Sequence, residues 1–318
     1  MSKSRPFTEE YANINGIKQY FLHYPASSGE VMLNIHGGPG QSEAPFAYYI
    51  ESQNTSLTSV YYDQRGTGKT LRKNPTTEKD VTLQKLVEDL AETVQYIKQK
   101  YQKNKIIISG HSWGSILGLL YTYQYPEDVL YYVGAGQIVN FKKGEKAVFN
   151  QLKKSAQNNA KDIRKLEDLG NYPDNIVSVK TFSKTAKTLM GIKNKYGVGM
   201  DMKKIKSISM KSPVFSFADV IAMLKAQKLT NHLWEAVFEF NAEEITNFQV
   251  PMYFIHGIND GQAPITQVQE YCHKISAPDK YLFPISDAGH ICPIDNLEET
   301  LLSGSKAMER YMNWNNVR

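Results

Sequence analysis

The stretch KIIISGHSWG, residues 105–114, decides the fold of this chain. The β-branched run over 105–109 predicts a buried strand, and the apolar stretch over 113–125, closed by Pro126, predicts a helix. Between them, Gly-His-Ser-Trp-Gly fits the pattern Gly-x-Ser-x-Gly at a strand-to-helix turn. Such a sharp turn strains the serine backbone and holds the hydroxyl clear of the sheet, so Ser112 is the candidate nucleophile.

Strand and helix patterns alternate around this turn. Asn15-Gly16 separates two strand-like runs, and this dipeptide tolerates the positive φ angles of a tight hairpin. The alternation that follows predicts a mostly parallel sheet with helices on its faces. Strand patterns cover residues 11–14, 17–23, 31–35, 59–62 and 129–133, and a helical pattern covers 83–101.

The pattern changes after about residue 136. Residues 140–248 show lysine-rich helical stretches and little strand signal, and a strand pattern resumes over 251–256. A helix over about 264–275, a strand over 280–284 and a last helix over 295–313 follow. We therefore expect one core domain, residues 1–139 and 249–318, interrupted by a helical cap over 140–248.

Composition excludes several classes of protein. A length of 318 residues suits one catalytic core with an inserted subdomain. The net charge of +5 comes from dispersed lysines, which predicts a solvated surface and no nucleic-acid binding. The two cysteines, Cys272 and Cys292, form no disulfide or metal-binding pattern. Cys292 follows His290 closely enough to line the pocket, but simple packing is the favoured interpretation.

The sequence also predicts where the protein works. The N-terminus lacks an apolar signal segment, and no apolar run approaches the roughly 18 residues that span a bilayer. We expect a soluble, cytoplasmic protein without membrane association. The oligomeric state is not indicated by the sequence.

A serine nucleophile needs a base, and His290 is the best of the seven histidines. It lies in Asp287-Ala288-Gly289-His290, just after a late strand, on a loop that can reach the nucleophile. Asp260 follows the strand over 252–256 and is the predicted acid that orients the imidazole. Asp279 precedes a strand, and Asp287 is too close to His290 along the chain, so both are weaker candidates.

Acyl transfer creates an oxyanion that needs hydrogen-bond donors. The backbone N–H of Trp113, at the predicted helix start, is one candidate. The loop His36-Gly37-Gly38-Pro39-Gly40 follows an early strand and supplies the other, the N–H of Gly38.

These motifs together resemble those of the proline iminopeptidases, a family of α/β-hydrolases that remove an N-terminal residue. The resemblance covers roughly residues 20–136 and 249–300, and its order of motifs is His36–Gly40, Asp63–Gly68, Gly110–Ser115, Gly257–Asp260 and Gly289-His290. It implies an α/β-hydrolase fold, a Ser112–Asp260–His290 triad and an oxyanion hole at Gly38 and Trp113. It also implies that Asp63 and Arg65 brace the site. This chain departs from the family at His111, commonly glycine, and at Thr70, commonly serine.

The resemblance also implies acidic cap residues that hold the substrate's amine. The candidates are Glu235 and Glu239, one helical turn apart, although a solvated face next to a packing face is the favoured interpretation of this pair. We expect a small-molecule or short-peptide substrate and no cofactor or metal. An esterase or lactonase stays open because fold and triad do not select the leaving group. A non-catalytic receptor is a third possibility, whereas epoxide hydrolase chemistry is disfavoured by a serine at position 112.

Overall fold

The computed structural model describes residues 5–27, 29–54, 56–176 and 178–316. Within these ranges the chain forms one eight-stranded sheet in the order β1-β2-β4-β3-β5-β6-β7-β8. Strands β1 and β2 pair antiparallel, β2 joins β4 antiparallel, and all later pairs are parallel, which confirms the predicted mostly parallel sheet. The strands are β1 Thr8–Ile14, β2 Ile17–Tyr24, β3 Val31–Ile35, β4 Thr58–Tyr62, β5 Ile106–His111, β6 Val129–Ala135, β7 Met252–Gly257 and β8 Lys280–Ile285.

The N-terminal hairpin forms where the sequence predicts it. Asn15 and Gly16 take φ angles of 43° and 78°, and Ile14 pairs directly with Ile17. Positive φ angles at both central residues match the twist of the flanking strands, which is why Asn-Gly favours this turn.

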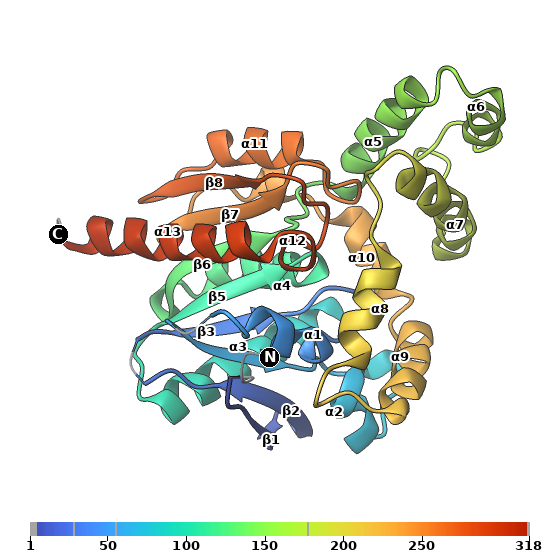
Figure 1. The fold of residues 1–318 in the computed structure, drawn as a ribbon. Helices are drawn as coiled ribbons and strands as arrows, with labels where there is room; N and C mark the ends of the chain where they lie inside the picture. The colour runs from blue at the N-terminus through green and yellow to red at the C-terminus, as the bar shows by residue number, and fades with distance from the viewer. Residues whose placement is uncertain (1–4, 28, 55, 177, 317–318) are drawn as a thin grey trace.

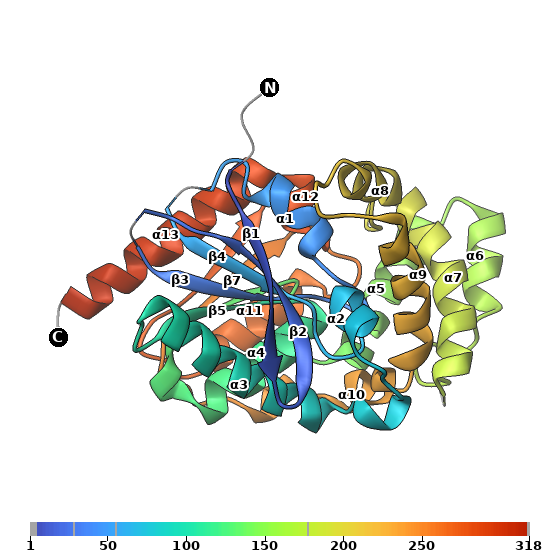
Figure 2. The ribbon, with the colours of Figure 1, turned by 90° about the horizontal axis from the view of Figure 1, so that it is seen from below.

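Helices cover both faces of the sheet (Figures 1 and 2). α3, α4 and α11 pack on one face, and α1, α12 and α13 lie on the other. α1 and α2 were not predicted, because helices of seven and six residues are too short to show a clear period. The helices outside the segment between β6 and β7 are α1 Ala44–Ile50, α2 Gly68–Lys73, α3 Leu83–Tyr101, α4 Trp113–Gln124, α11 Ile265–Lys274, α12 Cys292–Asp295 and α13 Leu297–Asn316, with 3-10 turns at Glu78–Asp80 and Pro126–Asp128.

The chain between β6 and β7 is helical and lies at one end of the sheet (Figure 1). It contacts the core through α8 and α9: the Tyr48 hydroxyl donates to the Ile208 carbonyl at 2.8 Å, and Arg72 pairs with Asp219 at 2.7 Å. We call this segment the cap. Its elements are α5 Phe141–Ser155, α6 Ala160–Glu167, α7 Val179–Lys195, α8 Met202–Met210, α9 Phe217–Leu229, α10 Leu233–Glu239 and a 3-10 turn at Ala242–Glu244.

Apolar packing differs between the two faces of the sheet. The face under α3 and α4 carries one continuous cluster that also extends into the cap. The opposite face carries two separate clusters, one beneath α13 and one beneath α1. The two clusters on that face therefore do not join into a single continuous layer.

Among the described residues, no helix combines the length and the apolar character needed to cross a bilayer.

Candidate active site

Ser112 occupies the turn between β5 and α4 with φ 53° and ψ −119°, a conformation that L-residues rarely adopt. Its backbone N–H is held by the Ala135 carbonyl at 3.0 Å. Glycine is required at position 114, because a Cβ there would lie 2.1 Å from the Ile35 carbonyl oxygen. The tight contact between α4 and the end of β3 thus presents the Ser112 hydroxyl at the carboxyl edge of the sheet.

The structure brings Ser112, His290 and Asp260 together. His290 Nε2 lies 2.8 Å from Ser112 Oγ, and His290 Nδ1 lies 2.8 Å from Asp260 Oδ2. An ionised carboxylate can only accept, so Nδ1 carries the ring proton and Nε2 is free to accept from the serine hydroxyl. The three side chains come from the ends of β5, β7 and β8, which meet at one edge of a parallel sheet.

The Asp260 carboxylate is buried and held in a fixed orientation. Its Oδ1 accepts backbone N–H groups from Gln262 at 2.7 Å and Ala263 at 2.9 Å. Burial alone would raise the pKa of Asp260, but the charges and hydrogen bonds of His290 and His256 hold its pKa far below the usual value. Asp260 therefore stays ionised throughout the physiological pH range.

The sequence prediction missed the role of His256. Its Nε2 lies 3.3 Å from Asp260 Oδ2 and donates to the Ala263 carbonyl at 2.6 Å. A histidine at the end of a buried strand gave no signal beyond its position, because its contact depends on how the following loop folds back.

The glycine loop is braced against Ser112 by buried polar contacts. His36 Nδ1 donates to the Gly37 carbonyl at 2.8 Å, and His36 Nε2 accepts from the Gln64 backbone at 3.0 Å. Gln64 also accepts the Trp113 indole N–H at 3.0 Å. A Cβ on Gly37 would lie 3.2 Å from the Ser112 Cβ, so the loop passes directly over the nucleophile.

The two predicted oxyanion donors are the next residues along the chain from this contact, since Gly38 follows Gly37 and Trp113 follows Ser112. Trp113 is the first residue of α4, where backbone N–H groups have no acceptor within the helix. Gly38 lines the cavity above Ser112 with φ +139°, a conformation that favours glycine.

A second acid–histidine pair lies beside the triad and was not predicted. Glu43, at the start of α1, lies 2.6 Å from His111 Nδ1 and accepts the Gly37 N–H at 3.2 Å. The other ring nitrogen of His111 donates to the His290 carbonyl at 3.0 Å. His111 therefore connects Glu43 to the backbone of His290.

The Glu43–His111 pair shifts both titrations. Burial alone would raise the pKa of Glu43, but the neighbouring His111 lowers it overall. Burial alone would lower the pKa of His111, but the charge of Glu43 and the bonds to Glu43 and the His290 carbonyl raise it. Both shifts favour a charged pair at the cavity wall.

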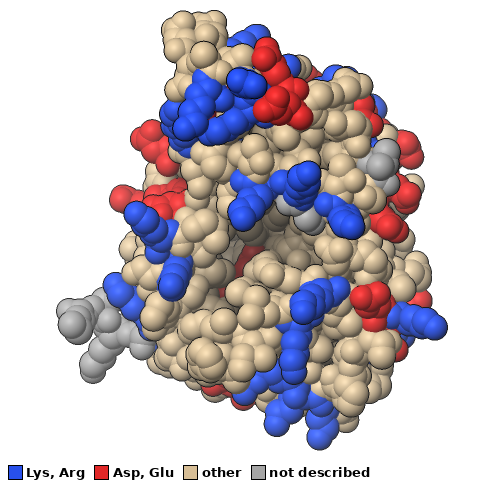
Figure 3. All heavy atoms as spheres, turned by 90° about the vertical axis from the view of Figure 1, so that its right-hand side faces the viewer, with Lys and Arg blue, Asp and Glu red and all other residues tan. Residues whose placement is uncertain are grey.

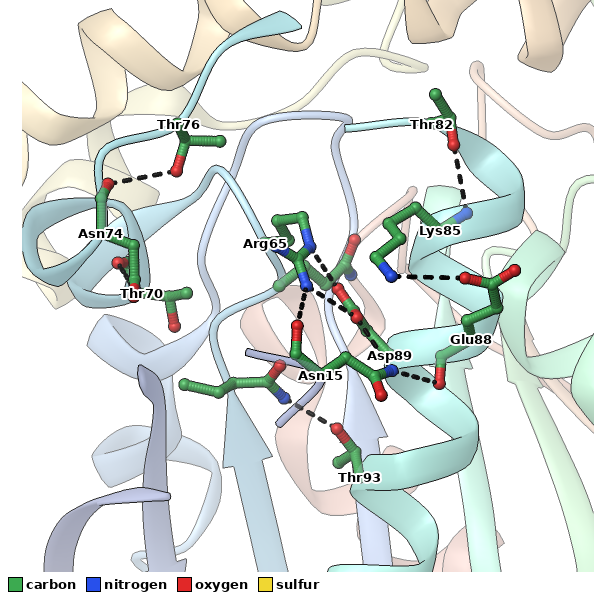
Figure 4. A network of polar contacts seen from close by, with 12 residues as sticks. Asn15, Arg65, Thr70, Asn74, Thr76, Thr82, Lys85, Glu88, Asp89 and Thr93 are labelled. Atoms are coloured by element: carbon green, nitrogen blue, oxygen red, sulfur yellow. Dashed lines mark hydrogen bonds and ion pairs between the residues drawn. The ribbon is translucent and has the colours of Figure 1, made fainter. Parts of the chain in front are cut away.

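Asp63 and Arg65 lie on the loop after β4, away from Ser112. Arg65 forms two hydrogen bonds to Asp89 on α3, at 2.6 and 2.9 Å, and donates to the Asn15 carbonyl at 3.1 Å (Figure 4). Asp63 accepts the Lys69 backbone N–H at 2.6 Å and a hydrogen bond from Ser42. These contacts tie the loop that holds Gln64 to the N-terminal hairpin and to two helices.

One cavity of about 920 Å³ opens at the triad and is lined by Ser112 and His290. Figure 3 shows a hollow on the cap side of the molecule, with lysine or arginine side chains around its rim and acidic atoms inside it. The cap contributes Met200, Ile205 and Trp234 to the lining.

Glu235 and Glu239 do not belong to this cavity. Both are exposed on α10, whereas Trp234 and Val237 of the same helix line the cavity. At about 100° per residue, the two glutamates point away from the face that Trp234 and Val237 share. Among the described residues, the glutamates that line the cavity are Glu43 and Glu51, and Glu43 is the one that contacts the glycine loop beside Ser112.

The other candidates of the sequence lie outside the triad. Asp279 pairs with Arg310 at 2.6 Å and accepts from the Tyr253 hydroxyl at 2.9 Å. Asp287 occupies a turn with φ 53°. Cys292 is buried beyond His290, and burial raises the pKa of its thiol.

Comparison with known proteins identifies the family to which this chain belongs. Residues 30–297 match the family described as the alpha/beta hydrolase fold. The chain belongs to this family. It is 24% identical over 272 residues to the probable aminopeptidase YbaC of Bacillus subtilis strain 168, which covers 82% of this chain and 83% of that protein.

Two further similarities are to proteins named proline iminopeptidase. This α/β hydrolase is 31% identical over 120 residues to the proline iminopeptidase of Saccharolobus solfataricus, which covers 37% of each protein. The crystal structure of the Mycobacterium smegmatis proline iminopeptidase has the same fold, with a TM-score of 0.70 and 16% identity over 98% of this chain and 100% of that one. The predicted α/β-hydrolase fold is confirmed, and hydrolase function is supported.

Proposed function

We propose that this protein is a serine hydrolase that acts through an acyl-enzyme on Ser112. The observation that carries the proposal is the continuous chain of hydrogen bonds from Ser112 through His290 to the buried Asp260, at 2.8 Å for each contact. This geometry is the one that activates a serine hydroxyl, because the base is oriented and its charged form is stabilised.

In the proposed reaction, Ser112 Oγ attacks the substrate carbonyl while His290 Nε2 takes the hydroxyl proton. The N–H groups of Trp113 and Gly38 donate to the developing oxyanion. His290 then gives its proton to the leaving group, and the carbonyl–leaving-group bond breaks. Water, deprotonated by His290, releases the acyl group and restores Ser112.

For the leaving group we propose an amine, as in an aminopeptidase of the proline iminopeptidase type. The names of the relatives support this assignment. The cavity also offers a carboxylate for a free substrate amine: both side-chain hydrogen bonds that Glu43 forms among the described residues reach Oε1, and Oε2 can accept from a ligand. In this proposal Glu43 takes the amine-binding role for which the family resemblance offered Glu235 and Glu239 as candidates.

A substrate panel tests this proposal. Proline 4-nitroanilide and other aminoacyl anilides are compared with their N-acetylated forms and with short aryl esters. An aminopeptidase cleaves the free-amine anilides and loses activity when the amine is blocked. Equal rates on free and blocked amines, or turnover of esters alone, rule out the aminopeptidase.

Labelling with a fluorophosphonate tests the nucleophile separately. The folded protein is expected to react at Ser112, and Ser112→Ala is expected to stay unlabelled with an unchanged melting temperature. A folded protein that does not label favours a non-catalytic receptor.

A carboxylesterase is the second candidate, and one observation favours it. The cavity at Ser112 is far larger than a single amino acid requires, and much of its lining is apolar. The extra volume extends from Ser112 along the face of the sheet.

A further inference from the structure

The cavity does not end at the triad. Beyond Ser112 its lining continues along the face of the sheet, over Ser109 of β5, Asn34 and Met32 of β3, and Ser59 of β4. On the other side it is lined by α1 and α13. We call this extension the sheet-face channel.

The channel exists because the face is incompletely covered. α1 has seven residues, whereas α13 has 20, and the apolar clusters beneath them are separate. The strand positions between the clusters include the small residues Ser59 and Ser109. Short side chains beneath a gap between two helices leave a space that a close-packed core would fill.

α13 presents a stripe of residues to the channel. Five residues of α13, spaced so that they share one face of the helix, line the channel: Thr300, Leu301, Gly304, Ser305 and Met308. A Cβ built on Gly304 meets no other atom within 4 Å, so the space beside this helix is open.

The depth of the channel follows from the strand geometry. Gly37 lies beside Ser112, and Met32 lies near the start of β3, five residues earlier in the chain. At the rise per residue of a strand, the distance between these two positions is about 16 Å. An extended chain advances roughly 1.2 Å per bond, so the channel matches about a dozen bonds.

Several polar groups of the channel wall form hydrogen bonds within the protein. The Thr300 hydroxyl donates to the carbonyl of Asn296, just before α13, at 2.7 Å, and the Ser305 hydroxyl donates to the Leu301 carbonyl within α13 at 3.1 Å. The Asn34 amide donates to the Val60 carbonyl at 3.3 Å. These groups offer few new hydrogen bonds to a ligand. A polar ligand would therefore lose its hydrogen bonds to water on entering the channel without replacing them, whereas an apolar chain has no such bonds to lose.

We propose that the sheet-face channel binds the linear apolar acyl chain of an ester substrate, while the ester carbonyl lies at Ser112. The inference rests on the proposed Ser112 nucleophile and assigns the substrate class of the second candidate. The Ser112 Oγ–carbonyl bond forms, the bond to the alcohol oxygen breaks, and the serine proton passes through His290 to that oxygen. Water then hydrolyses the acyl-enzyme and the fatty acid leaves.

The test is a chain-length series of 4-nitrophenyl esters, from acetate through butyrate and octanoate to laurate, on the full chain. kcat/KM is expected to rise with chain length in the natural protein, since each buried methylene contributes to binding. Gly304→Phe is expected to lower the laurate-to-butyrate ratio of kcat/KM by about tenfold or more, because the ring occupies the middle of the channel.

The matched control is Gly191→Phe. Gly191 is an exposed residue of α7 with no atom within 4 Å of its Cβ position, and it does not line the cavity. This variant is expected to keep the natural chain-length profile.

Three results overturn the inference. The first is a kcat/KM in the natural protein that falls steadily from acetate to laurate, which needs no variant to observe. The second is a Gly304→Phe protein, folded by its melting temperature, with the natural laurate-to-butyrate ratio. The third is a Gly304→Phe effect on dodecyl acetate but not on the laurate ester, which would place the alcohol chain in the channel.

Failure of the proposed function looks different. A protein that neither reacts with a fluorophosphonate at Ser112 nor hydrolyses any ester refutes the nucleophile. A protein that labels at Ser112 but prefers acetate refutes the acyl channel alone.

Discussion

Replacing Asp260 by asparagine tests the proposed catalytic chain with little disturbance of the fold. Asp260 Oδ1 accepts two backbone N–H groups, from Gln262 and Ala263, and only an oxygen can take that place. In Asp260→Asn the amide oxygen therefore stays at Oδ1, and the NH₂ group faces His290 Nδ1 at the 2.8 Å position. Because NH₂ only donates, His290 must accept at Nδ1 and carry its proton on Nε2.

The loss of rate follows from this change of tautomer. A protonated Nε2 directed at Ser112 Oγ, 2.8 Å away, cannot take the serine proton. Substitutions of this kind in Ser-His-Asp triads lower kcat about 10⁴-fold. At 1.36 kcal/mol for each factor of ten, the barrier rises by roughly 5.4 kcal/mol. KM is expected to change far less, because Asp260 does not line the cavity.

The assay is kcat on a 4-nitrophenyl ester or proline 4-nitroanilide, whichever the protein hydrolyses, with the melting temperature as the check on folding. Asp279→Asn is the matched control, since it makes the same chemical change at a carboxylate whose partners are Arg310 and Tyr253. Its kcat is expected to stay near that of the natural protein.

An Asp260→Asn protein that folds and keeps kcat within about tenfold of normal would show that the orientation of His290 does not depend on Asp260. Equal losses in Asp260→Asn and Asp279→Asn would point to a general structural effect and would also contradict the assignment.

Two further predictions concern stability. Arg65→Met is expected to lower the free energy of unfolding by roughly 3–5 kcal/mol, because it leaves Asp89 buried without its charged partner. The control is Lys85→Met, at an exposed ion pair in the same region (Figure 4), which should lower the free energy of unfolding by less than about 0.5 kcal/mol. Both values are measured by urea unfolding, and equal effects of the two substitutions would contradict the bracing role of Arg65. Asp162 accepts hydrogen bonds from Lys195, Lys165 and Tyr196, and these contacts lower its pKa from 3.8 to about 2. Because the folded pKa is depressed, this stabilisation is present above pH 3.8 and is lost as pH falls toward 2. The gap in urea midpoint between the natural protein and Asp162→Asn should therefore narrow over that range, and a constant gap would refute the assignment.

Much of the fold could be predicted because its signals are local. The Asn15-Gly16 turn depends on the backbone preferences of two adjacent residues, and the long helix α3 depends on a period within 19 residues. The short helices α1 and α2 carry too few residues for such a period. The last helix begins at Leu297, about two residues after the predicted start, because Asn296 takes a non-helical conformation with φ −139° and ψ 83°.

The candidate site also contains residues that local sequence patterns predict and contacts that they do not. Ser112 is indicated by its neighbours along the chain, because the turn at Gly110–Gly114 demands small residues at fixed positions. The contact of Glu43 with His111 joins residues 68 positions apart in the chain, so no local sequence pattern predicts it. The direction of Glu235 is likewise set by which face of α10 packs on the core.

The sequence by itself determined the succession of strands and longer helices in the core, the elbow that carries Ser112 and the choice of His290 and Asp260 as its partners. Only the tertiary structure decided that Glu43 lies in the cavity while Glu235 and Glu239 do not, and that a channel separates α1 from α13. The physical reason is that turn chemistry and periodicity act between residues close along the chain. The shape of a cavity depends instead on the side chains that distant elements bring together and on the space that they leave unfilled.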